Sequence, residues 1–236
     1  LGVPGAFESG NWPGDMPWLK IPVGLYDCPE RQEQGVLYLD LEAEGHYGIY
    51  GCAGSGKTML LKAILYSLGR WYSPRDISIY IMDLGSWSLK TFEQMPHVGG
   101  VVLSSEEEKF DKLAGILREE FAKRKKSFSK YGISSLKDYR ENISGDIPAI
   151  VLAIDNIPPI FELCPAYEEL LTTIAQEGAS YGIYLIYTSS TQTGIRYKIT
   201  QSTPGAVTFE QNDNTMYSSL VGGDRTSHRL VAGRKG

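Results

Sequence analysis

The chain alternates short apolar runs with longer segments that have one apolar face. The short runs, of about three to six residues, predict buried strands, because they lack the polar alternation of a half-exposed strand. Strands and helices that alternate along a chain are typical of an α/β fold with a mainly parallel sheet and helices on both faces. The predicted strands of this part are His46–Tyr50, Ile77–Met82, Val101–Leu103, Ala149–Ile154, Ile183–Tyr187 and Ala206–Phe209.

Three longer segments repeat apolar residues at the spacing of an amphipathic helix. Gly69 is expected to end the first helix and Gly132 the second, since glycine is a common stop signal. Ser104 and Ser105 precede the second helix, and a serine hydroxyl there can cap it. The predicted helices are Thr58–Leu68, a long one that follows Ser105 towards Lys130, and Tyr167–Ala179.

The first part of the chain has a different pattern. Residues 1–20 are rich in Gly, Pro and Trp, which favour turns over helices, so we expect a linker or arm there. Ile21–Leu25 and Gly35–Leu41 are predicted to be short strands. We assign residues 21–236 to one domain. Since the sequence starts at Leu1 rather than Met, we also expect an excised piece of a longer protein.

Composition narrows the classes of protein. With 236 residues, 42% of them hydrophobic, the chain can bury a core of its own. Its net charge of −5 argues against DNA as the main partner, since surfaces that bind nucleic acid are usually basic. Three isolated cysteines suggest neither a disulfide framework nor a zinc site. No apolar run approaches the roughly 18 residues of a membrane span.

The strongest chemical signal follows the His46–Tyr50 strand. The eight residues Gly51, Cys52, Ala53, Gly54, Ser55, Gly56, Lys57 and Thr58 match the phosphate-loop pattern G-x-x-x-x-G-K-[ST] completely. The glycines let backbone N–H groups turn inward around phosphates. Lys57 is expected to reach the β- and γ-phosphates, and the Thr58 hydroxyl to bind Mg²⁺. The N-terminal end of the next helix adds a favourable dipole. The sequence therefore predicts binding of a nucleoside triphosphate, ATP with Mg²⁺.

An acidic residue is also needed beside the magnesium ion. Asp155 ends the apolar strand Ala149–Ile154, so we assign it, with Thr58, to the metal site. Asp83, at the end of Ile77–Met82, has the same setting and is the second candidate.

The next residue bears on hydrolysis. Enzymes of this type often carry Glu after that Asp, where it orients or deprotonates the attacking water. Here the position is Asn156, whose carboxamide can hold a water but cannot take its proton. We therefore expect binding to be intact and hydrolysis slow or absent, with no confident catalytic residue. Glu162 is the alternative base, supported only by its nearness in sequence.

Beyond these motifs, the chain resembles the FtsK/SpoIIIE family of hexameric motor ATPases over roughly residues 20 to 222. Within it, the chain is most similar to the EssC/EccC ATPases of type VII secretion systems, which carry several modules in tandem, and it resembles a downstream module, the second. The segments that carry the resemblance are Ile21–Asp27, Leu39–Leu41, Gly45–His46, Pro96–Val101, Leu117–Glu120, Lys123–Lys125, Tyr131–Ile133 and Gly182–Ile186.

The resemblance implies a RecA-like P-loop NTPase fold and a place on the cytoplasmic side of the membrane, as part of a membrane-anchored protein. It implies as partners neighbouring ATPase modules of the same longer chain, other secretion-system components and small helical export substrates, with a hexamer as one assembly of the full-length protein.

The sequence also departs from active modules of this family, with Asn156 for Glu, Thr188–Gln192 for the usual sensor stretch, and Gly178-Ala179 for Gly-Arg. These departures imply a module that binds ATP, turns it over poorly, and serves assembly or regulation of export.

The sequence argues against two other functions. An active FtsK-like DNA translocase would be expected to carry Glu at position 156, a clear sensor Gln and a basic loop, and the sequence has none of these. A purely structural module with a vestigial loop is disfavoured by the intact Lys57 and Thr58.

Several further residues are of types that can contact a nucleotide or a metal ion. Trp71, Trp87 and Tyr181 are candidates for stacking on adenine, although packing is the better interpretation because aromatic side chains are core residues first. The three histidines are too scattered in sequence to suggest a metal cluster. The basic run Lys123–Lys126, like Arg118, is expected to form a solvated helix face, and neither is assigned as an arginine finger.

Overall fold

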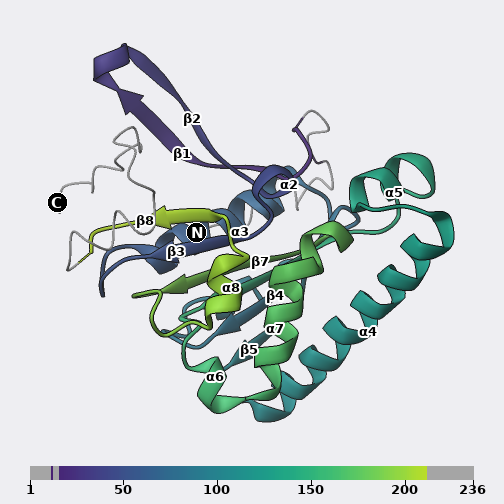
Figure 1. The fold of residues 1–236 in the computed structure, drawn as a ribbon. Helices are drawn as coiled ribbons and strands as arrows, with labels where there is room; N and C mark the ends of the chain where they lie inside the picture. The colour runs from purple at the N-terminus through teal and green to yellow at the C-terminus, as the bar shows by residue number, and fades with distance from the viewer. Residues whose placement is uncertain (1–11, 13–15, 212–236) are drawn as a thin grey trace.

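A six-stranded sheet forms the centre of the molecule (Figure 1). The computed structural model describes Trp12 and residues 16–211. Every pair of neighbouring strands in this sheet runs parallel, which confirms the predicted α/β class. In their order across the sheet, the strands are β5 (Val98–Leu103), β4 (Ile77–Asp83), β6 (Ala149–Asp155), β7 (Ile183–Ser189), β3 (Tyr47–Tyr50) and β8 (Gly205–Thr208).

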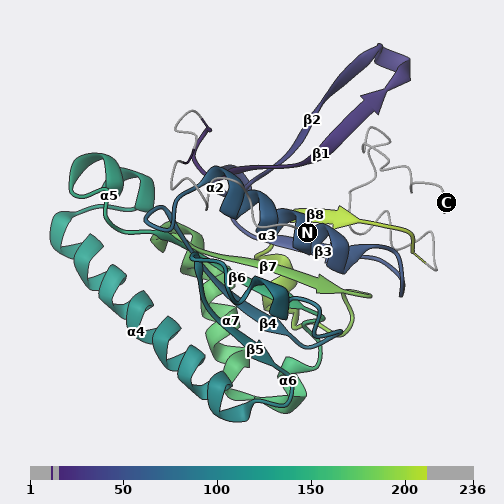
Figure 2. The ribbon, with the colours of Figure 1, turned by 180° about the vertical axis from the view of Figure 1, so that it is seen from behind.

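Helices cover both faces of this sheet, and the view from behind shows α3 crossing the face opposite α4 and α7 (Figure 2). The α-helices are α2 (Leu41–Glu44), α3 (Lys57–Trp71), α4 (Glu107–Tyr131), α5 (Leu136–Asn142), α6 (Ile160–Leu163), α7 (Ala166–Glu177) and α8 (Tyr197–Gln201). The 3₁₀ helices are η1 (Pro29–Arg31), η2 (Lys90–Phe92) and η3 (Gly178–Tyr181).

The core consists of two apolar clusters, one on each side of the sheet. Strand β6 supplies both, because successive side chains of a strand point to opposite faces. Val151 packs in the cluster under α3, whereas Leu152 packs in the cluster under α4 and α7. All seven residues of β6 are buried, which explains its continuous apolar sequence. The sheet is thus packed on both faces, and the loops that follow its strands begin from well-packed residues.

The strands predicted near the N-terminus form a separate antiparallel ribbon, β1 (Lys20–Cys28) with β2 (Glu33–Asp40). It projects from the body at the top of Figure 1. Most of the predicted linker, residues 1–11 and 13–15, lies outside the described residues. Within the described part of residues 1–20, Leu19 is fully buried and Trp12 donates a hydrogen bond from Nε1 to the Gly69 carbonyl at 3.0 Å. The domain boundary at residue 21 stays a prediction.

Two predicted helix boundaries were wrong. Helix α3 continues past Gly69 to Trp71, and Gly69 is buried within it, where its carbonyl receives the Trp12 indole. Helix α4 begins at Glu107 without a serine cap. The Glu106 carboxylate instead accepts the Leu103 N–H at 3.0 Å, before the helix starts. Gly69 therefore lies inside its helix rather than after its end, and a glutamate closes the turn before the second helix.

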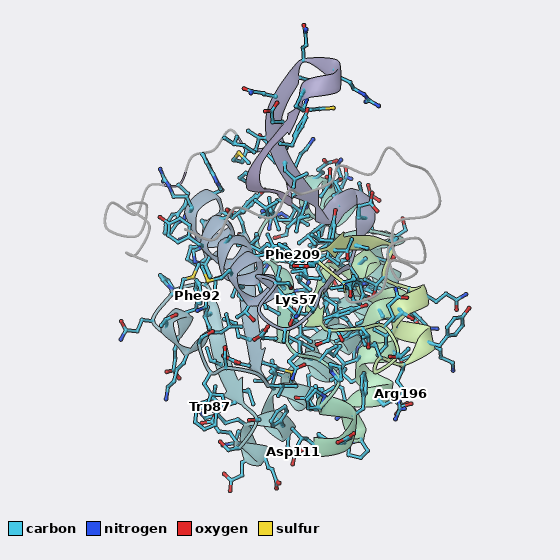
Figure 3. All side chains as sticks on the ribbon, turned by 90° about the vertical axis from the view of Figure 1, so that its left-hand side faces the viewer. Lys57, Trp87, Phe92, Asp111, Arg196 and Phe209 are labelled. Carbon is cyan, nitrogen blue, oxygen red and sulfur yellow. The ribbon has the colours of Figure 1, made fainter. Side chains whose placement is uncertain are left out.

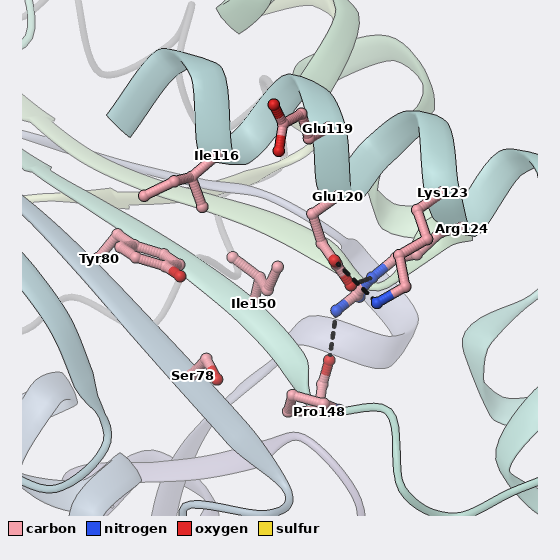
Figure 4. Close-up of a pocket in the computed structure, with 9 residues that line it drawn as sticks. All are labelled: Ser78, Tyr80, Ile116, Glu119, Glu120, Lys123, Arg124, Pro148 and Ile150. Carbon is pink, nitrogen blue, oxygen red and sulfur yellow. Dashed lines mark hydrogen bonds and ion pairs between the residues drawn. The ribbon is translucent and has the colours of Figure 1, made fainter. Parts of the chain in front are cut away.

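Arg124 does not lie on a solvated helix face, so that prediction was wrong. Its side chain is 1% exposed and its guanidinium donates to three backbone carbonyls and one carboxylate. Figure 4 shows two of these acceptors, Pro148 O at 2.8 Å and Glu120 Oε1 at 2.9 Å. The other two are Tyr181 O at 2.9 Å and Gly182 O at 3.2 Å. Arg124 thereby joins α4 to the starts of β6 and β7. The exposed Lys123 beside it matches the prediction.

His46, directly before β3, is a buried group that titrates. Its Nδ1 accepts the Leu185 N–H at 2.9 Å, and its Nε2 is buried without a hydrogen-bond partner in the described part of the chain. Burial lowers the pKa of His46 to about 4, because the charged imidazolium would lose its hydration. The folded protein therefore holds this imidazole neutral.

We expect His46 to make the protein less stable in mild acid. In the unfolded chain the imidazole gains a proton below its ordinary pKa of about 6.5, whereas the folded chain resists protonation down to about pH 4. The free energy of unfolding should fall by about 2 kcal/mol from this group between pH 7 and pH 5. Chemical denaturation of wild type and His46→Asn, whose Oδ1 can replace Nδ1 as acceptor, measures it. Identical pH dependence in the two proteins would contradict the assignment.

Candidate functional site

The predicted phosphate loop lies at the carboxyl ends of the parallel strands. Residues 51–56 connect β3 to α3, so the loop is held between a buried strand and a helix. Gly54 and Gly56 have φ of 75° and 106°, in the left-handed region that side chains with a Cβ rarely adopt. Lys57 is the first residue of α3, whose first N–H groups have no partner within the helix. Strand, loop and helix therefore follow one another as the motif requires.

Two polar side chains of this loop point to an anion site. The Lys57 ammonium donates to the carbonyls of Gly51 and Cys52, at 2.7 and 2.8 Å, which holds the positive charge within the loop. Partial burial lowers the pKa of Lys57. The Ser55 hydroxyl is buried and has no hydrogen-bond partner among the described residues. A buried donor without a partner next to an ammonium and a helix N-terminus fits a group rich in acceptor oxygens, such as a phosphate.

The structure brings Thr58 and Asp155 together, although 97 residues separate them in sequence. The Thr58 hydroxyl lies 3.0 and 3.1 Å from the two carboxylate oxygens of Asp155. Thr188, at the end of β7, donates from Oγ1 to Asp155 Oδ1 at 2.7 Å. Since β7 lies between β3 and β6, its terminal hydroxyl is well placed to orient this carboxylate. The side-chain atoms that meet here are all oxygen atoms, and oxygen is the element that Mg²⁺ prefers as a ligand.

Asn156 has a left-handed backbone conformation, which asparagine adopts more readily than most residues. Its φ is 64°, and Asn is one of the few residues with a side chain that enter this region readily. Its N–H donates to Thr188 Oγ1 at 2.8 Å, so the same threonine fixes both Asp155 and the residue after it. A glutamate here would carry a backbone strain of about 1–2 kcal/mol that Asn largely avoids. The carboxamide thus fits the local fold as well as changing the chemistry.

Asp83, the second candidate for the metal, has a different task. It is fully buried, and its two carboxylate oxygens accept the N–H groups of Gly85, at 3.2 Å, and Leu89, at 2.8 Å. These bonds shape the loop after β4. Gly85 in that loop passes so close to Asp155 that a Cβ added to it would lie 2.9 Å from Asp155 Oδ2. The Asp83 carboxylate is therefore engaged by the loop after β4, whereas the Asp155 carboxylate faces the Thr58 hydroxyl.

The other candidates lie apart from these groups. Glu162 is exposed on α6, and no hydrogen bond of the described residues connects it to Asp155. Tyr181 packs edge-on against Phe121 on the α4 side. Trp71 is partly buried against the core at the far end of α3, while Trp87 is 55% exposed on the loop after β4. His228 lies outside the described residues.

Two residues beside this site are not evident from the sequence pattern. Thr188 differs from the usual sensor stretch of the family, yet its hydroxyl donates a hydrogen bond to Asp155. Phe209 directly follows β8, the strand beside β3, and lies next to two glycines of the phosphate loop. Figure 3 labels it close to Lys57. The usable signal was position, because residues that follow neighbouring parallel strands gather at one edge of the sheet.

A separate cavity of about 410 Å³ lies at the other end of the sheet (Figure 4). Ser78, Tyr80 and Ile150 line it from the first residues of β4 and β6, and Arg124 closes it from α4. Because the strands are parallel, this amino end is opposite the phosphate loop. The cavity is therefore no part of the nucleotide site.

Among the described residues, no cluster of three or more His, Cys, Asp or Glu side chains could hold a metal ion. In the same part of the chain, no helix is long and apolar enough to cross a membrane.

The comparisons with known proteins agree on the family of this chain. Residues 18–199 match the family model described as "FtsK/SpoIIIE family". The chain is similar to the ESX secretion system protein EccC of Geobacillus thermodenitrificans (strain NG80-2), with 31% identity over 202 residues. This match covers 86% of the chain but only 14% of that protein. The chain thus spans about one seventh of the length of this curated relative.

Solved structures agree. "EssC (ATPases 2 and 3) from Geobacillus thermodenitrificans" has a TM-score of 0.83 and 29% identity, covering 94% of this chain and 43% of that one. "Thermomonospora curvata EccC (ATPases 2 and 3) in complex with a signal sequence peptide" has a TM-score of 0.76 and 25% identity, covering 86% of this chain and 38% of that one. The resemblance inferred from the sequence is therefore confirmed.

Proposed function

Because the chain belongs to the FtsK/SpoIIIE family and is homologous to the EssC/EccC ATPases of type VII secretion, we propose that it is an ATP-binding module of such a secretion motor. In this proposal it holds ATP with Mg²⁺ at the phosphate loop and hydrolyses it slowly or not at all. The bound nucleotide then acts mainly as a structural or regulatory ligand.

The observation that carries the proposal is the meeting of Thr58 with Asp155 at 3.0 Å. A hydroxyl from the phosphate loop and a carboxylate from β6 are the protein oxygens that a magnesium ion beside a triphosphate needs. When bound, the ion would neutralise charge on the phosphates. Lys57 and the N-terminal turn of α3 would bind the phosphates, and Thr188 would keep Asp155 oriented.

Slow turnover is proposed from Asn156 and its surroundings. Enzymes of this type often use a glutamate that orients or deprotonates the water that attacks the γ-phosphate. The carboxamide of Asn156 cannot accept the proton of that water, and the next carboxylate in sequence, Glu162, is exposed on another helix. Asp155 is engaged by two hydroxyl groups. The geometry therefore favours retention of the nucleotide over its hydrolysis.

The partners follow from the relatives. Because the relatives' solved chains hold ATPases 2 and 3 together, we propose neighbouring ATPase modules of a longer chain as the direct partners. By analogy with the EccC structure bound to a signal sequence peptide, small helical export substrates and other secretion-system components are further partners. The proposed location is the cytoplasmic side of the membrane, within a membrane-anchored protein, with a hexamer as the assembly.

Magnesium dependence tests the proposed site. Calorimetric titration of wild type should show micromolar or tighter ATP binding with Mg²⁺, and weaker binding in EDTA. Asp155→Asn should remove most of this difference, because it replaces the charged ligand. Asp83→Asn should retain it, since the Asp83 carboxylate accepts hydrogen bonds from the N–H groups of Gly85 and Leu89 in the loop after β4. Absence of ATP binding to wild type would sink the proposal, and loss of magnesium dependence in Asp83→Asn alone would transfer the metal site to Asp83.

A further inference from the structure

The phosphate loop leaves open where the nucleotide base lies, and the order of the strands limits the answer. Across the sheet the order is β6, β7, β3 and β8. Asp155, on β6, lies two strands from β3, or about 10 Å at the usual spacing between strands. The magnesium end of the triphosphate therefore points from the loop towards β6. Since the loop binds the middle of the phosphate chain, the base extends the other way, towards β8.

The first residue after β8 is aromatic. We propose that Phe209 is the surface on which the adenine base packs, an inference that rests on the proposed binding of ATP. Its ring lies beside the glycines of the loop, such that a Cβ on Gly56 would be 3.7 Å from Phe209 Cε1 and 4.0 Å from Cζ. On Gly51 a Cβ would be 2.9 Å from the Cβ of Phe209. The glycines allow the aromatic residue to approach the loop closely.

Two backbone hydrogen bonds hold Phe209 in this place. Its N–H donates to the Tyr50 carbonyl at 2.8 Å, immediately before the phosphate loop. The Cys52 N–H, within the loop, donates to the Glu210 carbonyl at 2.8 Å. The backbone of Phe209 and Glu210 is therefore tied to Tyr50 and to the phosphate loop, which fixes the point from which the ring extends. A flat apolar ring fixed in advance costs little entropy on binding.

Phe209 also has a packing role, which the test must separate from the proposed one. The side chain is partly buried and packs against the cluster under α3. Its substitution by alanine would leave a gap there. Leucine keeps an apolar side chain and removes only the aromatic face, while tryptophan keeps the face. The three aromatic candidates from the sequence are not suited to stack on the adenine base. Trp71 and Tyr181 pack elsewhere, and Trp87 lies on the loop after β4.

The experiment compares two probes, MgATP and magnesium tripolyphosphate, which differ by the nucleoside. Calorimetry on Phe209→Leu should show about a tenfold loss of MgATP affinity, within the range that stacking on one base provides. Affinity for tripolyphosphate should stay within about twofold of wild type. Phe209→Trp should retain MgATP binding. Phe128→Leu, a matched substitution of a buried phenylalanine on α4, should leave both affinities unchanged while lowering stability.

The outcomes separate the alternatives. Unchanged MgATP affinity in Phe209→Leu would overturn the inference, and so would a parallel loss for tripolyphosphate, which would show that the ring only supports the loop. If wild type bound tripolyphosphate but gained no affinity from the nucleoside, the inference would fail and the phosphate site would stand. If wild type bound neither probe, the proposed function itself would fail.

Discussion

Replacing Lys57 with methionine is expected to weaken ATP binding by about 100-fold, because hydrogen bonds between charged groups contribute roughly 1.5–3 kcal/mol each. The ammonium already lies in the loop, 2.7 and 2.8 Å from two of its carbonyls, and is placed to meet phosphate oxygens. Methionine keeps the length of the side chain but carries no charge. Isothermal titration calorimetry with MgATP measures the change.

Lys62 provides the matched control, since it is another half-buried lysine on α3, one turn and a half further along. Lys62→Met should bind MgATP as wild type does. Thermal melts of both variants without nucleotide check that each is folded. Wild-type affinity in Lys57→Met would show that the loop does not hold the phosphates and would contradict the account of the site.

The largest effect on stability is expected at Arg124. Arg124→Met should lower the free energy of unfolding by about 3–5 kcal/mol, as removal of one partner from a buried charged network does. The substitution removes the arginine donor from the carbonyls of Pro148 and Tyr181, whereas the Gly182 carbonyl keeps the Ile150 N–H at 2.8 Å. Each buried acceptor left without a donor costs about 1–3 kcal/mol. Urea denaturation at pH 7 measures the difference.

Lys123→Met is the control for this prediction. The two basic residues are adjacent on α4, but Lys123 is 79% exposed and forms a long ion pair with Glu120, at 3.7 Å. Its loss should change stability by no more than about 0.5 kcal/mol. Equal stability of the two variants would show that Arg124 is dispensable for joining α4 to the sheet.

Lys57 and Arg124 show which roles can be predicted from sequence and which cannot. Lys57 was found from sequence because its role depends on neighbours within eight residues of chain. Arg124 was missed because its role depends on residues 24 to 58 positions away, which only the fold brings near. A basic residue between lysines on a helix has the same local pattern whether it is buried or exposed. Local motifs are therefore predictable where long-range pairs are not.

The strands of the sheet were predicted well for the same reason. Continuous apolar runs such as β6 and β7 are buried on both faces, and their sequences carry that constraint directly. The boundaries were less accurate. Strand β5 begins at Val98, three residues before its predicted start. The prediction missed these residues because glycine is not typical of strands, whereas Gly99 is needed here for its close approach to Tyr80. The short helices α2, α5, α6 and α8 have too few residues to show a period.

The candidate site divides in a similar way. Thr58 and Asp155 could be paired from sequence, since the phosphate-loop motif requires an acid at the end of a buried strand. Asp83 had the same setting, and only its bonds to Gly85 and Leu89 distinguish it. The positive φ of Asn156 could not be read from sequence either. It adds a structural reason for a substitution that sequence could explain only through lost chemistry.

Our central proposal is that this module binds ATP and hydrolyses it slowly or not at all. The direct measurement is a single-turnover experiment, in which radiolabelled ATP is mixed with excess protein and Mg²⁺ and the bound nucleotide is followed over time. The account predicts that the nucleotide binds and remains ATP over an hour at 25 °C. Conversion of the bound ATP to ADP within seconds would contradict it, and would show that another group takes the proton that Asn156 cannot accept.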